Sequence, residues 1–179
     1  MPPEAVLSLG CSECPRLVAT SLPGRDYWAL EEIMDTVVAR DPAAKVKATG
    51  YRGVFEVLSG QDPQGLAVQF LMYNHAFIAR VLPVLACAIP VKLKEALSGL
   101  GLSGLRARLE FKAREPLKGT LTEDLVRSAL ASAGVILVGR REGGVIIDVE
   151  SLGKCVIISF GEPRSCGPRC TVLVPSRSL

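Results

Sequence analysis

The chain has 179 residues, of which 49% are hydrophobic and 22% charged, with a formal net charge of +3. This is enough apolar material for one or two globular domains, and it excludes a chain that is disordered throughout. No apolar run reaches the roughly 18 residues of a membrane helix, and MPPEAVLSLGC at the start lacks the positive charge of a secretory signal. We therefore expect a cytoplasmic protein with no membrane partner.

The charge is unevenly distributed along the sequence. Residues 1–87 hold 7 Lys and Arg against 9 Asp and Glu, whereas residues 88–179 hold 14 against 9. A basic second half indicates an anionic partner such as nucleic acid, although the same excess is also common on ordinary soluble domains.

Hydrophobic periodicity predicts alternating strands and helices in the first half. Asp62 followed by Pro63 is an N-cap with proline at the first helical position, and it starts one helix. The other helix is expected over 24–40, where apolar residues recur at helical spacing, namely Tyr27, Leu30, Ile33, Met34, Val37 and Val38. Strands are expected at 16–21, 44–49, 52–58 and within 77–89. The order β-α-β-β-α-β is that of a ferredoxin-like unit.

The second half predicts the order α-β-α-β-β-β. Its helices are expected at 90–101 and 121–134, and its strands at 105–114, 135–138, 145–151 and 154–160. From Gly161 onward the sequence is rich in Pro, Ser, Gly and Arg, which is typical of an irregular tail. The fold class is therefore α+β.

The segment LRARLEFKAR at 105–114 is the clearest strand. Its alternation places apolar side chains on one face and charged ones on the other, namely Arg106, Arg108, Glu110, Lys112 and Arg114. Same-face residues repeat about every 6.6–6.8 Å, close to the spacing of successive phosphates. The four cations repel one another, and an anionic partner would relieve that cost. We predict phosphate contact here, with a solvated sheet face as the alternative. The patch is extended, if their loops fold nearby, by Lys118, Arg140, Arg141 and Lys154.

Signals for an enzyme are weak. Glycine-rich nucleotide-binding motifs and G-x-S-x-G are absent from the sequence. His75 is the only histidine, and a position at a helix end, favoured by the helix dipole, explains it without catalysis. We predict no cofactor and no catalytic residue.

The cysteines leave three interpretations open. Cys11-x-x-Cys14 precedes the first strand and Cys166-x-x-x-Cys170 lies in the tail. These four thiols could bind zinc if the two pairs meet in space. Disulfides, which also occur inside cells of hyperthermophiles, and free thiols are the alternatives. Cys87 lies in an apolar run, which favours a small buried side chain.

Four segments together resemble THUMP proteins, the RNA-binding modules of enzymes that thiolate, methylate or pseudouridylate tRNA. They are TGYRGVFEVLSGQDPQGLA, AFIARVLPV, EFKAREPLKGTLTEDLVRSAL and GGVIIDVESLGKCVIISF. The similarity covers about residues 16–160 and is nearest to stand-alone archaeal relatives of the TAN-type tRNA acetylation adaptor. It implies a ferredoxin-like domain at 16–88 and a THUMP-like RNA-binding domain at 89–162, between an extension at 1–15 and a tail at 163–179. One departure is VILVGRREGG, which is shorter than the corresponding THUMP segment.

The resemblance implies a tRNA-binding adaptor without catalytic activity, which presents tRNA to a separate modification enzyme such as an acetyltransferase. Arg52, in the turn Gly50-Tyr51-Arg52-Gly53, would then either face RNA or pair with an acid on a helix. A rival from another class is a ferredoxin-like regulatory module that dimerises through its sheets and binds a small molecule at the turn 22–25. A weaker rival is an enzyme that uses a cysteine thiol.

Overall fold

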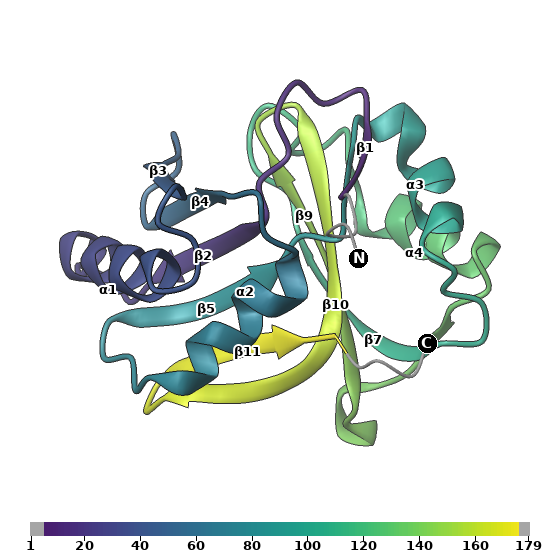
Figure 1. Ribbon diagram of the computed structural model, residues 1–179. Helices are drawn as coiled ribbons and strands as arrows, with labels where there is room; N and C mark the ends of the chain where they lie inside the picture. Colours follow the sequence, from purple (N-terminus) through teal and green to yellow (C-terminus); the bar gives the residue numbers. More distant parts are fainter. Residues whose placement is uncertain (1–5, 176–179) are drawn as a thin grey trace. The chain divides into compact units, whose positions relative to one another are not determined.

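A computed structural model describes residues 6–175 and shows an α+β protein (Figure 1). The chain folds into two compact units, and neither is continuous in sequence. Within the described residues, the first unit comprises 15–84 and 163–175, and the second comprises 6–14 and 85–162. The segments expected as an extension and a tail therefore contribute to the two units.

The first unit contains a sheet with the order β3-β4-β2-β5-β11. Neighbours are antiparallel except β11 and β5, which are parallel and pair Thr171 with Arg80. The helices α1 and α2 lie on one face of this sheet (Figure 1). The elements are β2 (Leu17–Ser21), α1 (Asp26–Val38), β3 (Lys45–Ala48), β4 (Val54–Leu58), α2 (Pro63–Gln69), the 3-10 helix η1 (Phe70–Met72), β5 (Ile78–Pro83) and β11 (Cys170–Val174).

Both helices predicted for this unit are present. The helix predicted over 24–40 is shorter, however, and not all of its apolar residues face the core. Asp62 caps α2 as expected, with its Oδ1 accepting a hydrogen bond from the Gly65 N–H at 2.8 Å. In α1, Ile33 and Val37 are fully buried. The remaining apolar positions of the α1 pattern do not all point inward, since 64% of Tyr27 is exposed. The apolar residues of α1 thus form two stripes, of which one packs on the sheet.

The second glycine of the turn between β3 and β4 is Gly53, and the structure explains why a glycine is needed there. Gly53 has φ of +71°, and a Cβ there would lie 2.8 Å from the Ser21 hydroxyl oxygen. The Ser21 N–H donates to the Gly53 carbonyl at 2.9 Å. Thr49 donates its hydroxyl to the Val54 carbonyl at 2.8 Å and closes the turn. A glycine is therefore required by conformation and by close approach to β2.

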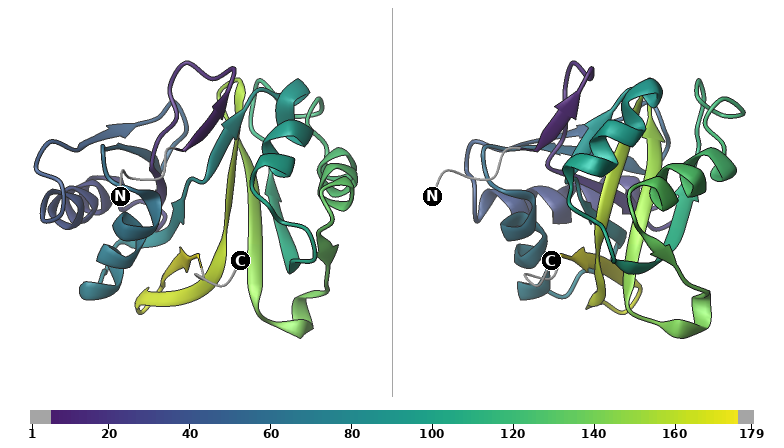
Figure 2. Two further views of the ribbon diagram at one scale, coloured as in Figure 1. Left: turned by 45° about the vertical axis from the view of Figure 1, so that its right-hand side comes forward. Right: turned by 90° about the vertical axis from the view of Figure 1, so that its right-hand side faces the viewer.

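The second unit contains a sheet with the order β8-β7-β9-β10, and β6 pairs with both β10 and β1. Strand β7 is parallel to β8 and to β9, while β9 and β10 form an antiparallel pair. The helices α3 and α4 cover one face (Figure 2). The elements are β1 (Leu7–Leu9), β6 (Ala86–Ala88), the 3-10 helix η2 (Pro90–Lys92), α3 (Leu93–Gly99), β7 (Arg106–Lys112), α4 (Glu123–Ser132), β8 (Ile136–Leu137), the 3-10 helix η3 (Arg140–Glu142), β9 (Val145–Leu152) and β10 (Cys155–Gly167). Residues 163–167 of β10 belong to the first unit.

The core of the second unit lies between these helices and the sheet. Leu97 of α3 and Leu130 of α4 are fully buried together with Ile147 and Ile158 of the two long strands. Thr122 caps α4 as expected, its hydroxyl accepting from the Leu125 N–H at 3.2 Å. The alternation that buries Ile147 turns its neighbours Ile146 and Asp148 to the opposite face of β9.

Strands form where the sequence pattern predicted an extension and a tail. Strand β1 pairs in parallel with β6, placing Leu7 beside Ala86. Strand β11 adds Val172, fully buried, to the core of the first unit. The partners β6 of β1 and β5 of β11 are far away in the sequence, so local periodicity carries no signal for these two pairings. The other neighbour of β11 is β10, which directly precedes it.

The cysteines form three disulfides, which decides among the three interpretations. Cys11 bonds to Cys155 and Cys14 to Cys87, both within the second unit, and Cys166 bonds to Cys170 within the first. The zinc candidate Cys11, Cys14, Cys166 and Cys170 is therefore wrong, because all four sulfur atoms are used in disulfides. Cys87 is buried, as expected, but as a disulfide partner.

No helix among residues 6–175 has the length and apolar character needed to cross a membrane.

Candidate nucleic-acid interface

The first group of predicted RNA-binding residues lies where β7 begins. The Arg106 guanidinium is 3.1 Å from the Glu142 carboxylate, so η3 lies against this end of β7. Arg140 and Arg141 belong to η3 and are exposed. These three arginines are called the η3 cluster. Glu142 offsets one of the three positive charges. The alternation within β7 alone could not predict this ion pair, because Glu142 lies in a different element.

A second group lies at the opposite end of β7. Lys112 is the last residue of β7 and pairs in register with Glu150 of β9. Lys154 lies in the turn between β9 and β10. Lys118 lies in the loop after β7, its N–H donating to the Arg114 carbonyl at 3.0 Å. Lys112, Lys118 and Lys154 are exposed and are called the lysine cluster.

Carboxylates separate the two clusters, which corrects the prediction of a continuous basic strand face. Arg108, in the middle of β7, is half-buried and lies 3.6 Å from Glu110. Next to β7, strand β9 places Asp148 beside Glu110 and Glu150 beside Lys112. Both carboxylates of β9 are almost fully buried. The alternation within VIIDVES puts them on one face of β9, but only the register with β7 shows that this is the face of the cations.

Arg114 was predicted on the exposed basic face, and this prediction is wrong. The residue is buried, and its guanidinium lies 2.9 Å from the Glu150 carboxylate. It also donates to the Ser151 carbonyl at 2.9 Å, and its backbone N–H donates to the Ser151 hydroxyl at 2.6 Å. Because β7 ends at Lys112, the strand alternation does not extend to position 114.

The charge asymmetry between the sequence halves disappears in the folded units. The first unit, 15–84 with 163–175, holds 9 Lys and Arg against 7 Asp and Glu. The second unit, 6–14 with 85–162, holds 11 against 10. Arg164 and Arg169 of the expected tail belong to the first unit, which removes the excess. A nucleic-acid interface in the second unit would therefore depend on local clusters and not on net charge.

Arg52 is exposed at the β3–β4 turn of the first unit. Within residues 6–175, no carboxylate lies at ion-pairing distance from its guanidinium. Of the two roles expected for Arg52, the local ion pair is therefore not formed. The side chain remains available to an anion.

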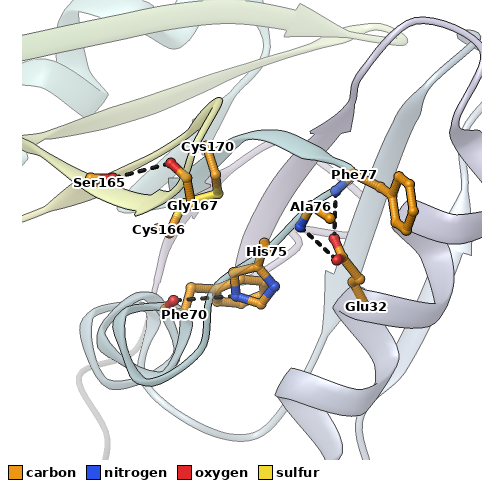
Figure 3. The surroundings of a disulfide bond; sticks show 9 residues. All are labelled: Glu32, Phe70, His75, Ala76, Phe77, Ser165, Cys166, Gly167 and Cys170. Atoms are coloured by element: carbon orange, nitrogen blue, oxygen red, sulfur yellow. Dashed lines mark hydrogen bonds between the residues drawn. A yellow bond between two sulfur atoms is a disulfide. The ribbon is translucent and has the colours of Figure 1, made fainter.

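His75 packs inside the first unit beside Phe70 (Figure 3). It is buried, and its Nε2 lies 3.2 Å from the Phe70 carbonyl oxygen. Its backbone N–H donates to the Cys166 carbonyl at 2.8 Å. Nearby, the Glu32 carboxylate accepts from the N–H groups of Ala76 and Phe77. Burial lowers the pKa of His75, while Glu32 and the Phe70 carbonyl raise it by less. The imidazole is thus held neutral as a packing element.

This lowered pKa predicts a pH dependence of stability. In the unfolded chain His75 binds a proton near its ordinary pKa of 6.5, whereas the folded protein resists protonation until lower pH. The free energy of unfolding should therefore fall as pH drops below 6.5, and His75→Gln should reduce that fall. Urea unfolding at pH 7.5, 6.5 and 5.5 measures the effect. An equal loss of stability in wild type and variant would contradict it.

Comparisons with known proteins supply a fold neighbour. No family model matches the sequence, and no curated protein matches it. Among solved structures 11 chains match. One is the crystal structure of PH1313 from Pyrococcus horikoshii Ot3, with a TM-score of 0.54 and 11% identity, covering 84% of this chain and 57% of that chain. This chain thus spans little more than half the length of PH1313. At such identity the likeness concerns the fold alone.

Proposed function

We propose that this protein is a tRNA-binding adaptor that presents tRNA to a separate modification enzyme, such as an acetyltransferase. The finer architecture we propose is a ferredoxin-like unit followed by a THUMP-like unit. The strand order β3-β4-β2-β5 and the element order β2-α1-β3-β4-α2-β5 support the first. The element order α3-β7-α4-β8-β9-β10 supports the second, because it matches the order predicted for the second half of the sequence, which the THUMP resemblance covers.

The observation that carries the RNA proposal is the pair of exposed cationic clusters at the two ends of β7. Arg106 and Lys112 are six residues apart on this strand, so the clusters are separated by roughly 20 Å at ~3.3 Å per residue. A folded RNA with helical segments can bring phosphates to both clusters at once, whereas the buried carboxylates between them discourage contact at the centre of β7.

The proposal predicts salt-dependent tRNA binding. The two clusters hold six exposed cations, and neutralising most of their phosphate partners implies a log–log salt slope of about −3 to −5. We expect micromolar or weaker affinity at moderate salt. Fluorescence anisotropy of labelled, unfractionated tRNA across a salt series measures both quantities. Binding that is unchanged between low and high salt would reject the proposal.

Three double variants with the same loss of charge provide the controls. Arg140→Gln with Arg141→Gln reduces the η3 cluster, and Lys112→Gln with Lys154→Gln reduces the lysine cluster. Each should weaken binding and reduce the magnitude of the log–log salt slope by about one to two units. The free energy of unfolding should change by no more than about 0.5 kcal/mol. Lys45→Gln with Lys47→Gln removes two charges from β3 of the first unit. If this third variant weakens binding most, the RNA surface lies in the first unit instead.

The adaptor proposal also predicts that the pure protein leaves tRNA chemically unchanged. The motivation is the buried, structurally engaged His75 together with six cysteines that are all in disulfides. Nucleoside mass spectrometry after incubation with tRNA and common group donors is the test. A new modified nucleoside that depends on one side chain of this protein would overturn the prediction and favour an enzyme.

A further inference from the structure

The first unit exposes an unusual number of large apolar side chains on its helices. Among the described residues, 8 of the 11 exposed large hydrophobic side chains belong to α1, α2, η1 and the residue after η1. They are Tyr27, Trp28, Met34, Val38, Val68, Leu71, Met72 and Tyr73. Single exposed apolar residues are ordinary on soluble proteins, but a concentration on one layer marks an interaction surface.

The apolar residues of α1 lie along one line of the helix. At about 100° per residue, Tyr27, Met34 and Val38 fall within an arc of about 40°, whose centre is about 80° from Val37 and about 120° from Ile33. They extend over about 16 Å at ~1.5 Å per residue, which is three helical turns. Trp28 lies about 100° away from Tyr27 on the same exposed side, and 52% of it is accessible.

Acidic side chains occupy the space between these residues. Glu31 and Asp35 are exposed and fall at about 40° and 80° from Tyr27, between the apolar line and Trp28. No Lys or Arg occurs in α1, over 26–38. The adjoining cations are Arg25 before the helix, Arg52 on the β3–β4 turn, and Arg40, which follows the helix and lies 3.9 Å from the Asp62 carboxylate. The surface formed by Tyr27, Trp28, Glu31, Met34, Asp35 and Val38 is called the α1 face.

The α1 face is held in place by the rest of the unit. Trp28 lies against Phe77, with ring centroids 6.0 Å apart, and Tyr27 meets Trp28 edge-on at 5.2 Å. Glu32, on the flank of α1, binds the N–H groups of Ala76 and Phe77 and so ties this loop to the helix (Figure 3). The aromatic side chains are therefore ordered before any partner arrives, which lowers the entropic cost of binding.

We propose that the α1 face docks a cationic amphipathic helix of a partner protein. Aromatic and methionine side chains are enriched at protein interfaces, and a line of apolar residues three turns long matches the apolar stripe of a second helix. The partner's lysines or arginines would lie beside Glu31 and Asp35. The positive groups Arg25 and Arg52 favour placing a negatively charged end of the partner near the start of α1.

The charges of the α1 face exclude nucleic acid and an anionic membrane as its occupants. Nucleic acid carries a dense negative charge and is repelled by Glu31 and Asp35. Helices that lie on anionic membranes present lysine and arginine on their polar face, whereas α1 has none. The α1 face lies in the first unit and the two cationic clusters in the second, so this proposal and the RNA proposal can fail separately.

Trp28 is the only tryptophan of the chain and reports directly on this surface. The probes are a synthetic 18-residue helical peptide with leucines on one face flanked by lysines, and the same peptide with glutamates in place of lysines. We expect the lysine peptide to bind the full chain, to shift Trp28 emission to shorter wavelength, and to bind at least about tenfold more tightly than the glutamate peptide. Vesicles containing phosphatidylglycerol should leave the emission unchanged.

Charge reversal provides the decisive control. Glu31→Lys with Asp35→Lys should reverse the preference, weakening the lysine peptide and strengthening the glutamate peptide by about tenfold each. Glu95→Lys with Asp124→Lys, at two exposed carboxylates of α3 and α4, changes the net charge equally and should preserve the preference. No binding of the lysine peptide, equal effects of the two variants, or a vesicle-induced shift of Trp28 would each overturn the proposal.

Discussion

Replacing Arg114 with methionine should lower the free energy of unfolding by about 3–5 kcal/mol, because it removes the buried cation that lies against a buried carboxylate. The guanidinium lies 2.9 Å from Glu150, which is 1% exposed, and also binds the Ser151 carbonyl. Urea unfolding followed by circular dichroism measures the loss. Adding Glu150→Gln to Arg114→Met should recover part of it, since the buried negative charge is then removed.

Lys112→Met is the matched control for this prediction. Lys112 is exposed at the end of β7, so its replacement should change stability by no more than about 0.5 kcal/mol. Equal stabilities for the Lys112 and Arg114 variants would mean that Arg114 is exposed, as the strand pattern first indicated. A protein that unfolds on losing Arg114 but tolerates loss of Lys112 would establish the different environments of two neighbouring cations.

Removing either long-range disulfide should destabilise the second unit strongly. Cys11 and Cys155 are 144 residues apart in sequence, and Cys14 and Cys87 are 73 apart. Each crosslink restricts a large loop of the unfolded chain, which corresponds to about 4–5 kcal/mol in the chain-entropy treatment. We expect Cys→Ser replacement of either pair to lower the melting temperature by on the order of 10 °C.

The short disulfide supplies the internal comparison. Cys166 and Cys170 are only 4 residues apart, and closing so small a loop is expected to contribute about 2 kcal/mol. Calorimetry of the three double Cys→Ser variants, with and without reductant, ranks them. A larger loss from the Cys166–Cys170 pair than from either long-range pair would show that loop entropy is not the dominant effect.

Elements with a strong local pattern could be predicted from the sequence. The α+β class is confirmed, and the helix at 24–40, the cap at Asp62 and the strand at 105–114 all correspond to elements of the structure. Each rests on information within about ten residues: a period of 3.6 or 2, or a capping side chain. Where such information ended, as after Lys112, extrapolating the pattern predicted an exposed side chain for Arg114, which is buried.

The remaining features depend on partners that are distant in sequence. The sequence around Cys87 predicts a buried apolar residue, because its disulfide partner Cys14 is 73 residues away. The cations of β7 predict a basic face, because the sequence does not show that the register with β9 places Asp148 and Glu150 beside them. Tyr27, Met34 and Val38 have the spacing of core positions, and only the direction in which α1 packs shows that they are exposed. Periodicity identifies a stripe but not the side that faces the sheet.

The interleaving of the two units has a consequence for biosynthesis. The first unit needs β11, so its sheet cannot be completed until residue 174 has left the ribosome. The second unit needs β1 at the start of the chain together with β6 and β10, so it waits for residues more than 140 positions later. Multidomain chains usually fold domain by domain during translation. This protein cannot do so, because each of its units needs segments from both ends of the chain. Dividing the chain at residue 84 would leave one fragment without β11 and the other without β1, whereas mixing the two fragments would restore every strand pair.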